Sequence, residues 1–131
     1  MAKTKKILIV DDERSLVELC QIILEAAGFD VRGAFSGREA LTMITEDVPD
    51  LVLLDVMMPG MDGIEVCRRI RTDHERYPRI VMYTADARDS TRSSSLTAGA
   101  NAVLPKETPV YDIPMHLANY LIPTGVLGPL N

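Results

Sequence analysis

Hydrophobic and polar positions follow two different rhythms along this chain. Short, nearly continuous aliphatic runs are typical of strands that are covered on both faces, as in a parallel sheet. Between them lie segments with apolar residues three and four positions apart, which predict amphipathic helices. This alternation predicts an α/β fold of the (βα)5 type, a doubly wound parallel sheet with right-handed crossovers. The predicted strands are Ile7–Val10, Asp30–Phe35, Leu51–Leu54, Ile80–Tyr83 and Ala102–Leu104.

Capping signals set the bounds of the predicted helices. Ser36 and Asp62 each stand three positions before a glutamate, which is the pattern of a capping box. Gly28 and Gly99 are suited to end the helices that precede them. The first helix is expected to carry one apolar stripe formed by Leu16, Leu19, Cys20, Ile23 and Ala27, and Asp112 is expected to cap the last helix. The predicted helices span 15–27, 37–46, 63–71, 89–98 and 113–122, and the fourth is poor in large apolar residues.

Composition agrees with a single globular domain. Of the 131 residues, 25% are charged and 47% are hydrophobic, as in an ordinary protein with one core. The net charge of −5 argues against general nucleic-acid binding, which needs an excess of Lys and Arg. No apolar run reaches the roughly 18 residues of a membrane span, and Cys20 and Cys67 lie at apolar helix positions, as expected of reduced cysteines in a cytoplasmic protein. We expect one domain over residues 1–122 and an irregular tail, broken by Pro and Gly, over 123–131.

Polar residues end the predicted strands. Asp11 and Asp12 follow the first strand, and one of them has the alternative role of capping the first helix. Asp55 follows the third strand, Thr84 the fourth and Lys106 the fifth. The carboxyl ends of parallel strands meet at one edge of such a sheet, where ligands bind. The sequence therefore predicts that these carboxylates, the hydroxyl and the ammonium converge there.

The residue types at this edge favour phosphoryl chemistry. Crowded carboxylates repel one another, and Mg²⁺ relieves that repulsion because it prefers oxygen ligands, including backbone carbonyls. The chain has no His/Cys cluster for zinc. With the cation, Lys106 would neutralise a phosphoryl group passing between oxygens, and Thr84 would hydrogen-bond one of its oxygens. Asp55 would be the nucleophile, since aspartates form acyl-phosphates.

Four stretches carry a family resemblance. In order and spacing, "ILIVDDE", "LVLLDVMMPGMDG", "VMYTADA" and "GANAVLPK" resemble the receiver domains of two-component response regulators, and the resemblance covers Lys5 to about Leu121. It implies a flavodoxin-like fold with strand order 2-1-3-4-5, in which Asp55 accepts a phosphoryl group from a phosphohistidine. It also implies that Asp12, Asp55 and the Met57 backbone carbonyl ligate Mg²⁺ directly, while Asp11 acts mainly through water.

The resemblance implies a signalling role and not an outside substrate. A sensor histidine kinase or a phosphotransfer protein would supply the phosphoryl group. The domain would catalyse only its own phosphorylation and dephosphorylation. Its output would be a change in protein–protein affinity, toward a downstream protein target or a phosphorylation-dependent dimer, without direct contact with nucleic acid or membrane. We expect either a single-domain regulator or a longer one cut at its C-terminus, because Met1 is a natural start.

Three features depart from the family pattern. The family proline follows the lysine, whereas here Pro105 precedes Lys106. Either the following loop takes a different path, or a cis bond between Lys106 and Glu107 stores strain. Val103 stands where the family has an aromatic switch, and a valine cannot swing as an aromatic ring does. The fourth helix is weak, and signalling through its ordering is a hypothesis.

Two other functions are kept as alternatives. One is an interaction module of the same fold that is never phosphorylated, which Val103 and the displaced proline favour. The other is a phosphoaspartate hydrolase, which would need a cap or pocket for its substrate. For the preferred function, Met57 and Asp86 lie two residues beyond Asp55 and Thr84 and are expected to set the lifetime of the acyl-phosphate.

Overall fold

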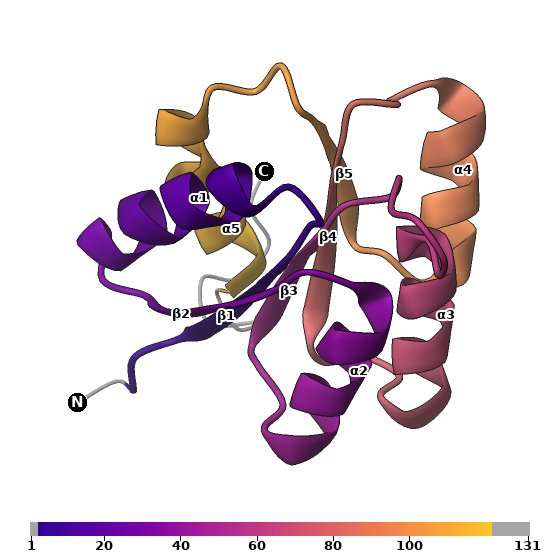
Figure 1. Cartoon of the computed structure of the whole chain (residues 1–131), viewed down its shortest axis with the longest axis horizontal. Coiled ribbons are helices and arrows are strands. Elements are labelled where there is room, and N and C mark those ends of the chain that lie inside the picture. Colours follow the sequence, from indigo (N-terminus) through magenta and orange to yellow (C-terminus); the bar gives the residue numbers. More distant parts are fainter. Residues whose placement is uncertain (1–2, 122–131) are drawn as a thin grey trace, which may run out of the picture.

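A computed structural model describes residues 3–121, and five parallel strands form its central sheet (Figure 1). The strands are β1 (Lys6–Val10), β2 (Asp30–Ala34), β3 (Leu51–Leu54), β4 (Arg79–Thr84) and β5 (Ala102–Pro105). The helices are α1 (Arg14–Ala26), α2 (Gly37–Glu46), α3 (Gly63–Asp73), α4 (Asp89–Ala98) and α5 (Ile113–Leu121), with a 3-10 turn at Val110–Asp112. The strand order β2-β1-β3-β4-β5 confirms the predicted fold.

The sheet is buried on both faces, which explains the continuous aliphatic runs. Helices α1 and α5 cover one face, and α2, α3 and α4 cover the other (Figure 1). Successive strand residues point to opposite faces, so each run feeds two cores. In β1, Ile7 and Ile9 pack under α1 and α5, while Leu8 and Val10 pack under α2 and α3. Both faces of β3 and β4 are filled in the same way.

The predicted capping residues act at two of the helices. Ser36 Oγ accepts a hydrogen bond from the Glu39 N–H at 3.1 Å, and Asp62 Oδ1 accepts one from the Glu65 N–H at 2.9 Å. These bonds satisfy N–H groups that the first turn leaves without a partner inside the helix. At the C-terminal end of α4, the predicted stop residue Gly99 has φ of +113°, a conformation that residues with a side chain disfavour.

Two predictions about the terminal helices are wrong. The buried residues of α1 are Val17, Cys20 and Leu24, so the predicted stripe shares only Cys20 with them. Leu16 of the predicted stripe is partly buried against the same core, whereas Leu19 is 41% exposed. Ile22, 65% exposed, shows the cause: this helix carries apolar residues on more than one face, and spacing alone does not select the inner one. At the last helix, the 3-10 turn precedes α5, so Asp112 is not its N-cap. Residue 122 and the predicted tail lie outside the described residues.

Candidate functional site

The first two acids of the site follow β1. Asp11 is 3% exposed, and its N–H donates to the Ala34 carbonyl of β2. Its Oδ1 accepts a hydrogen bond from the Glu13 N–H at 2.9 Å. Asp12 is exposed beside it. Because Glu13 is the N-cap of α1, neither aspartate takes the alternative role of capping that helix.

Asp55 is fixed from two sides of its backbone. Its N–H donates to the Val10 carbonyl at 2.9 Å, which extends the β1–β3 pairing by one step. On the other side, the first turn of α3 lies against the Asp55 carbonyl: a Cβ on Gly63 would stand 1.9 Å from that oxygen. Gly63 therefore permits the close approach, and the Gly63 N–H donates to the Val56 carbonyl at 2.8 Å. Sequence reasoning placed Asp62 and Gly63 at a helix start but did not identify this contact.

Three carboxylates meet where these segments end. Asp11, Asp12 and Asp55 each offer an oxygen, and these oxygens lie within 4.8 Å of one another. Only oxygen donors are present in this cluster, which fits a hard cation such as Mg²⁺. Met57, the predicted carbonyl ligand, is 61% exposed, and its N–H lies 3.4 Å from Asp55 Oδ1. No described residue donates a hydrogen bond to the Met57 carbonyl.

Lys106 supplies the positive charge of the site. Its Nζ donates to Asp11 Oδ2 at 2.8 Å and lies 3.5 Å from Asp55 Oδ1. The Lys106 N–H donates to the Thr84 carbonyl at 2.9 Å, so the backbone of β4 positions the lysine. Among residues 3–121 the cis peptide bond lies at Tyr77–Pro78, and Lys106–Glu107 is trans. The alternative of a strained cis bond in the loop after β5 is therefore wrong.

Thr84 ends β4 and is fully buried. Its Oγ1 accepts a hydrogen bond from the Asp86 N–H at 3.0 Å. Asp86 is turned toward α4: its carboxylate accepts hydrogen bonds from Arg88 at 2.7 and 2.9 Å and from the Thr91 hydroxyl at 2.7 Å. These donors hold the pKa of Asp86 well below its usual range, Arg88 first and Thr91 second. The expected influence of Met57 and Asp86 on acyl-phosphate lifetime stays a prediction.

The charges of the site are unbalanced. Burial, reinforced by the Asp11 carboxylate, raises the pKa of Asp55 to about 6, although Lys106 and the Met57 N–H oppose the shift. Burial alone would lower the pKa of Lys106, but its contacts with Asp11 and Asp55 outweigh that effect and raise it. One ammonium lies beside a cluster of three carboxyl groups, and a bound divalent cation would favour the ionised form of Asp55.

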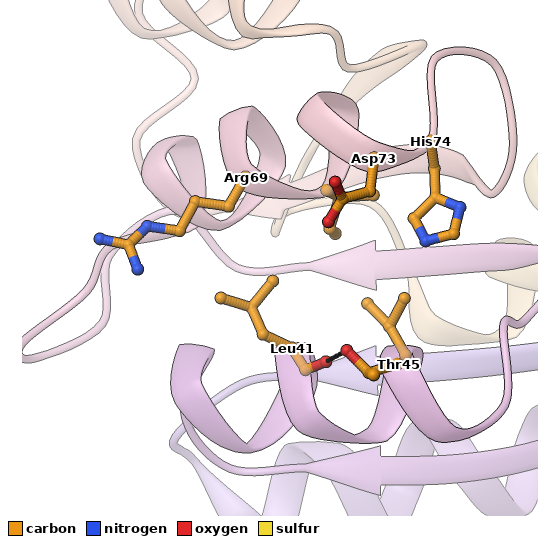
Figure 2. A pocket seen from close by; sticks show the side chains of 7 residues that line it. Leu41, Thr45, Arg69, Asp73 and His74 are labelled. Carbon is orange, nitrogen blue, oxygen red and sulfur yellow. Dashed lines mark hydrogen bonds between the residues drawn. The ribbon is translucent and has the colours of Figure 1, made fainter.

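Two further features lie apart from this cluster. Val103, at the aromatic position of the family pattern, is 5% exposed and buried in the core beneath α2, α3 and α4. A hollow of about 220 Å³ lies between α2 and α3, where Leu41 and Thr45 face Asp73 and His74 (Figure 2). None of the acids at the sheet edge lines this hollow, so it is not part of the site.

The sequence matches a known protein family over most of its length. The family model of the response regulator receiver domain matches residues 7–117. The chain is a member of the receiver-domain family. In receiver domains the acidic pocket binds Mg²⁺, and acceptance of a phosphoryl group is the function of the family. None of the helices within residues 3–121 has the length and hydropathy that a membrane crossing requires.

Curated relatives of this receiver domain are longer regulators. The alkaline phosphatase synthesis transcriptional regulatory protein PhoP of Bacillus subtilis is 45% identical over 102 residues, which are 78% of this chain and 42% of PhoP. Response regulator MprA of Mycolicibacterium vanbaalenii is 46% identical over 101 residues, which are 77% of this chain and 43% of MprA. The receiver domain therefore spans less than half the length of either relative.

Solved receiver structures have the same fold. A putative response regulator of Chloroflexus aurantiacus is 36% identical, with a TM-score of 0.84 over 91% of this chain and 98% of its own. A CheY-like receiver domain protein of Methanospirillum hungatei has a TM-score of 0.86 at 29% identity, covering 91% and 94% of the two chains. TrrA of Thermotoga maritima, solved with Mg²⁺ and BeF, has a TM-score of 0.80 at 33% identity, covering 90% and 100%.

Proposed function

We propose that Asp55 is the phosphoryl acceptor of this receiver domain. The observation that carries the proposal is a nearly buried carboxylate, 4% exposed, that shares its surroundings with two further acids and one lysine. An isolated buried carboxylate would be costly, and a second buried carboxylate beside it, that of Asp11, adds repulsion. A bound cation would offset the repulsion between these carboxylates, and the site would then be suited to hold a phosphoryl group.

In this proposal each residue has a role that follows from its charge and its hydrogen-bonding groups. An oxygen of Asp55 attacks phosphorus, and the bond between phosphorus and the donor's nitrogen breaks as the acyl-phosphate forms. Lys106, 3.5 Å from Asp55 in the resting state, then pairs with a phosphoryl oxygen, and the Thr84 hydroxyl donates a hydrogen bond to another. Asp11, Asp12, Asp55 and the Met57 carbonyl would hold Mg²⁺. When bound, the cation neutralises charge on the transferring group.

The partners follow from the same chemistry. A phosphohistidine of a sensor kinase or phosphotransfer protein is the proposed donor. The domain has no enzymatic role beyond its own phosphorylation and dephosphorylation in this proposal. Its output is a changed affinity for a protein target or for a second copy of the chain. TrrA, solved with Mg²⁺ and BeF, supports a metal-assisted site in a relative of the same fold.

The test is phosphorylation without a partner. The purified protein is incubated with acetyl phosphate and Mg²⁺ and analysed by intact-mass spectrometry. We expect an added phosphoryl mass in the wild type, none in Asp55→Asn, and none when EDTA replaces Mg²⁺. A wild type that stays unmodified would overturn the proposal and favour the interaction module that is never phosphorylated. The Asp62→Asn variant is a control, because this exposed N-cap residue lies outside the acidic cluster.

A further inference from the structure

Helix α4 is held at its two ends by polar contacts and not by an apolar inner face. Its buried residues are Thr91 and Ser95, and the Ser95 hydroxyl is the one buried side-chain polar group within residues 3–121 that has no hydrogen-bond partner. Its N-cap, Arg88, makes no side-chain capping bond. Such a helix has little apolar burial to keep it in place, so individual hydrogen bonds decide its local stability.

The two ends of α4 are tied to different parts of the molecule. At the C-terminal end, Arg71 of α3 donates from Nε to the Gly99 carbonyl at 2.9 Å and from a second nitrogen to Asn101 at 3.1 Å. At the N-terminal end, the Thr91 hydroxyl donates to the Asp86 carboxylate at 2.7 Å. The hydrogen bonds of Arg71 join α3 to the C-terminal end of α4. The hydrogen bond of Thr91 joins the N-terminal end of α4 to Asp86, which lies two residues beyond Thr84 of the candidate site.

Asp86 links Thr91 to Thr84 through two successive hydrogen bonds. Its N–H donates to Thr84 Oγ1 at 3.0 Å, and its carboxylate accepts from Thr91. Arg88 holds the carboxylate in place with a fork of two bonds. A change in the position of the Thr84 hydroxyl therefore reaches α4 without any aromatic side chain. The side chain of Val103, buried at the usual aromatic position, has no polar group that could contact the Thr84 hydroxyl. The Val103 carbonyl accepts a hydrogen bond from Arg92 of α4 at 3.4 Å, and this contact does not involve Thr84.

We propose that Asp86 and Thr91 are positioning residues that couple the orientation of the Thr84 hydroxyl to the N-terminal half of α4. The proposal rests on the function proposed above. When Thr84 turns to donate to a phosphoryl group on Asp55, its oxygen leaves the Asp86 N–H. The segment from Ala85 to Arg88 is then released, and Thr91 loses its fixed acceptor. The N-terminal half of α4 loosens, while Arg71 keeps the C-terminal end in place.

The experiment measures amide hydrogen exchange along α4 with and without beryllofluoride and Mg²⁺, the stable stand-in for the phosphoryl group. In the wild type, we expect exchange at residues 92–95 to rise about fivefold when beryllofluoride binds, the factor that one hydrogen bond of ordinary strength is worth. Exchange at Gly99 and Ala100, next to the hydrogen bond from Arg71, should rise by a factor less than half of that expected for residues 92–95.

Three variants separate coupling from simple destabilisation. Thr91→Val keeps the shape of the side chain but removes the hydroxyl, so exchange at 92–95 should be high in both states and the ratio should fall to about one. Thr91→Ser restores the hydroxyl and should restore the ratio. Thr97→Val makes the same change at an exposed position of the same helix and should behave as the wild type does.

The outcomes are distinct from those of the phosphorylation test. If the wild type takes up phosphoryl mass but α4 exchange does not rise on beryllofluoride binding, the coupling proposal is wrong and the acceptor proposal stands. The same holds if Thr91→Val keeps the wild-type ratio. If the wild type takes up no phosphoryl mass, both proposals fail. Coupling would also be excluded if Thr91→Ser behaved like Thr91→Val, since the hydroxyl would then have no role.

Discussion

Helices α3 and α4 pack side by side on the same face of the sheet but are held there by different interactions (Figure 1). The inner face of α3 buries Val66, Cys67 and Ile70, and Asp62 caps its first turn. The inner face of α4 buries two hydroxyl residues, and its N-cap residue, Arg88, makes no side-chain capping bond. A fully buried large apolar side chain contributes about 1.5–3 kcal/mol. The apolar residues of α3 therefore anchor it more strongly than the hydroxyls anchor α4.

This difference matches what each helix contacts in the site. The first turn of α3 lies against the backbone of Asp55, and a shift there would move the acidic cluster. Hydrogen bonds through Asp86 link helix α4 to Thr84. Hydrophobic burial is non-directional and is lost gradually, whereas a hydrogen bond depends steeply on geometry. An anchored α3 preserves the acceptor, and a hydrogen-bonded α4 is able to respond to it.

The largest effect is expected where α3 contacts Asp55. Gly63→Ala would place a methyl group 1.9 Å from the Asp55 carbonyl oxygen. The three nearest atoms belong to the backbone of Asp55 and Val56, so no flexible side chain can give way. We expect the free energy of unfolding to fall by about 3 kcal/mol or more, as for severe overpacking. Urea unfolding followed by circular dichroism measures it. Phosphoryl uptake from acetyl phosphate should fall as well, because Asp55 is displaced.

A second glycine provides the matched control. Gly28 has φ of +100°, and a Cβ there would meet nothing within 4 Å. Gly28→Ala should lower stability by about 1–2 kcal/mol through backbone strain alone and leave phosphoryl uptake unchanged. If Gly63→Ala were no more harmful than Gly28→Ala, α3 would not be fitted tightly against Asp55, and the contrast with α4 would weaken.

Sequence alone predicted the parts of this comparison that follow from local pattern. The aliphatic runs predicted the strands, because a strand buried on both faces needs continuous apolar residues. The acids after Val10 and Leu54 were placed at the same edge by sheet topology. The scarcity of large apolar residues in 89–98 also indicated a weak fourth helix.

Features that depend on contacts between distant segments could not be predicted. The inner face of α1 was misplaced because Leu19 and Val17 are equally suited by spacing, and only packing against the sheet selects Val17. The role of Gly63 depends on how closely a helix approaches a strand end. The bond from Thr91 to Asp86 depends on the path of the loop between β4 and α4.

A smaller effect on stability is expected from the ionisation of Asp55, the residue against which α3 is packed. Burial raises its folded-state pKa to about 6, and the unfolded value is close to 4. The folded state therefore binds the proton more tightly, so the stabilising contribution is complete below pH 4 and is lost as the pH rises through 6. In EDTA, we expect the ionisation of Asp55 to make the protein about 1–2 kcal/mol less stable at pH 7 than at pH 4.

The Asp55→Asn variant isolates this contribution from all other titrating groups. Urea unfolding of both proteins is measured at several values between pH 4 and 7, and the difference between them is plotted. The stability of the variant relative to the wild type should grow with pH. A difference that is flat across this range, or that has the opposite slope, would show that the carboxylate is already compensated without a cation, against the charge imbalance of the site.

The smallest effect is expected on α4 itself, from Ser95→Ala. The Ser95 hydroxyl is buried without a partner, so its removal relieves an unmatched desolvation penalty. Alanine also has the higher helix propensity, an advantage that Ser93→Ala, at an exposed position of the same helix, would share. We expect Ser95→Ala to raise the free energy of unfolding by about 0.5–1 kcal/mol more than Ser93→Ala does. If the two variants were equal, the inner hydroxyl of α4 would impose no penalty, and the weak attachment of this helix would have to come from its missing apolar residues alone.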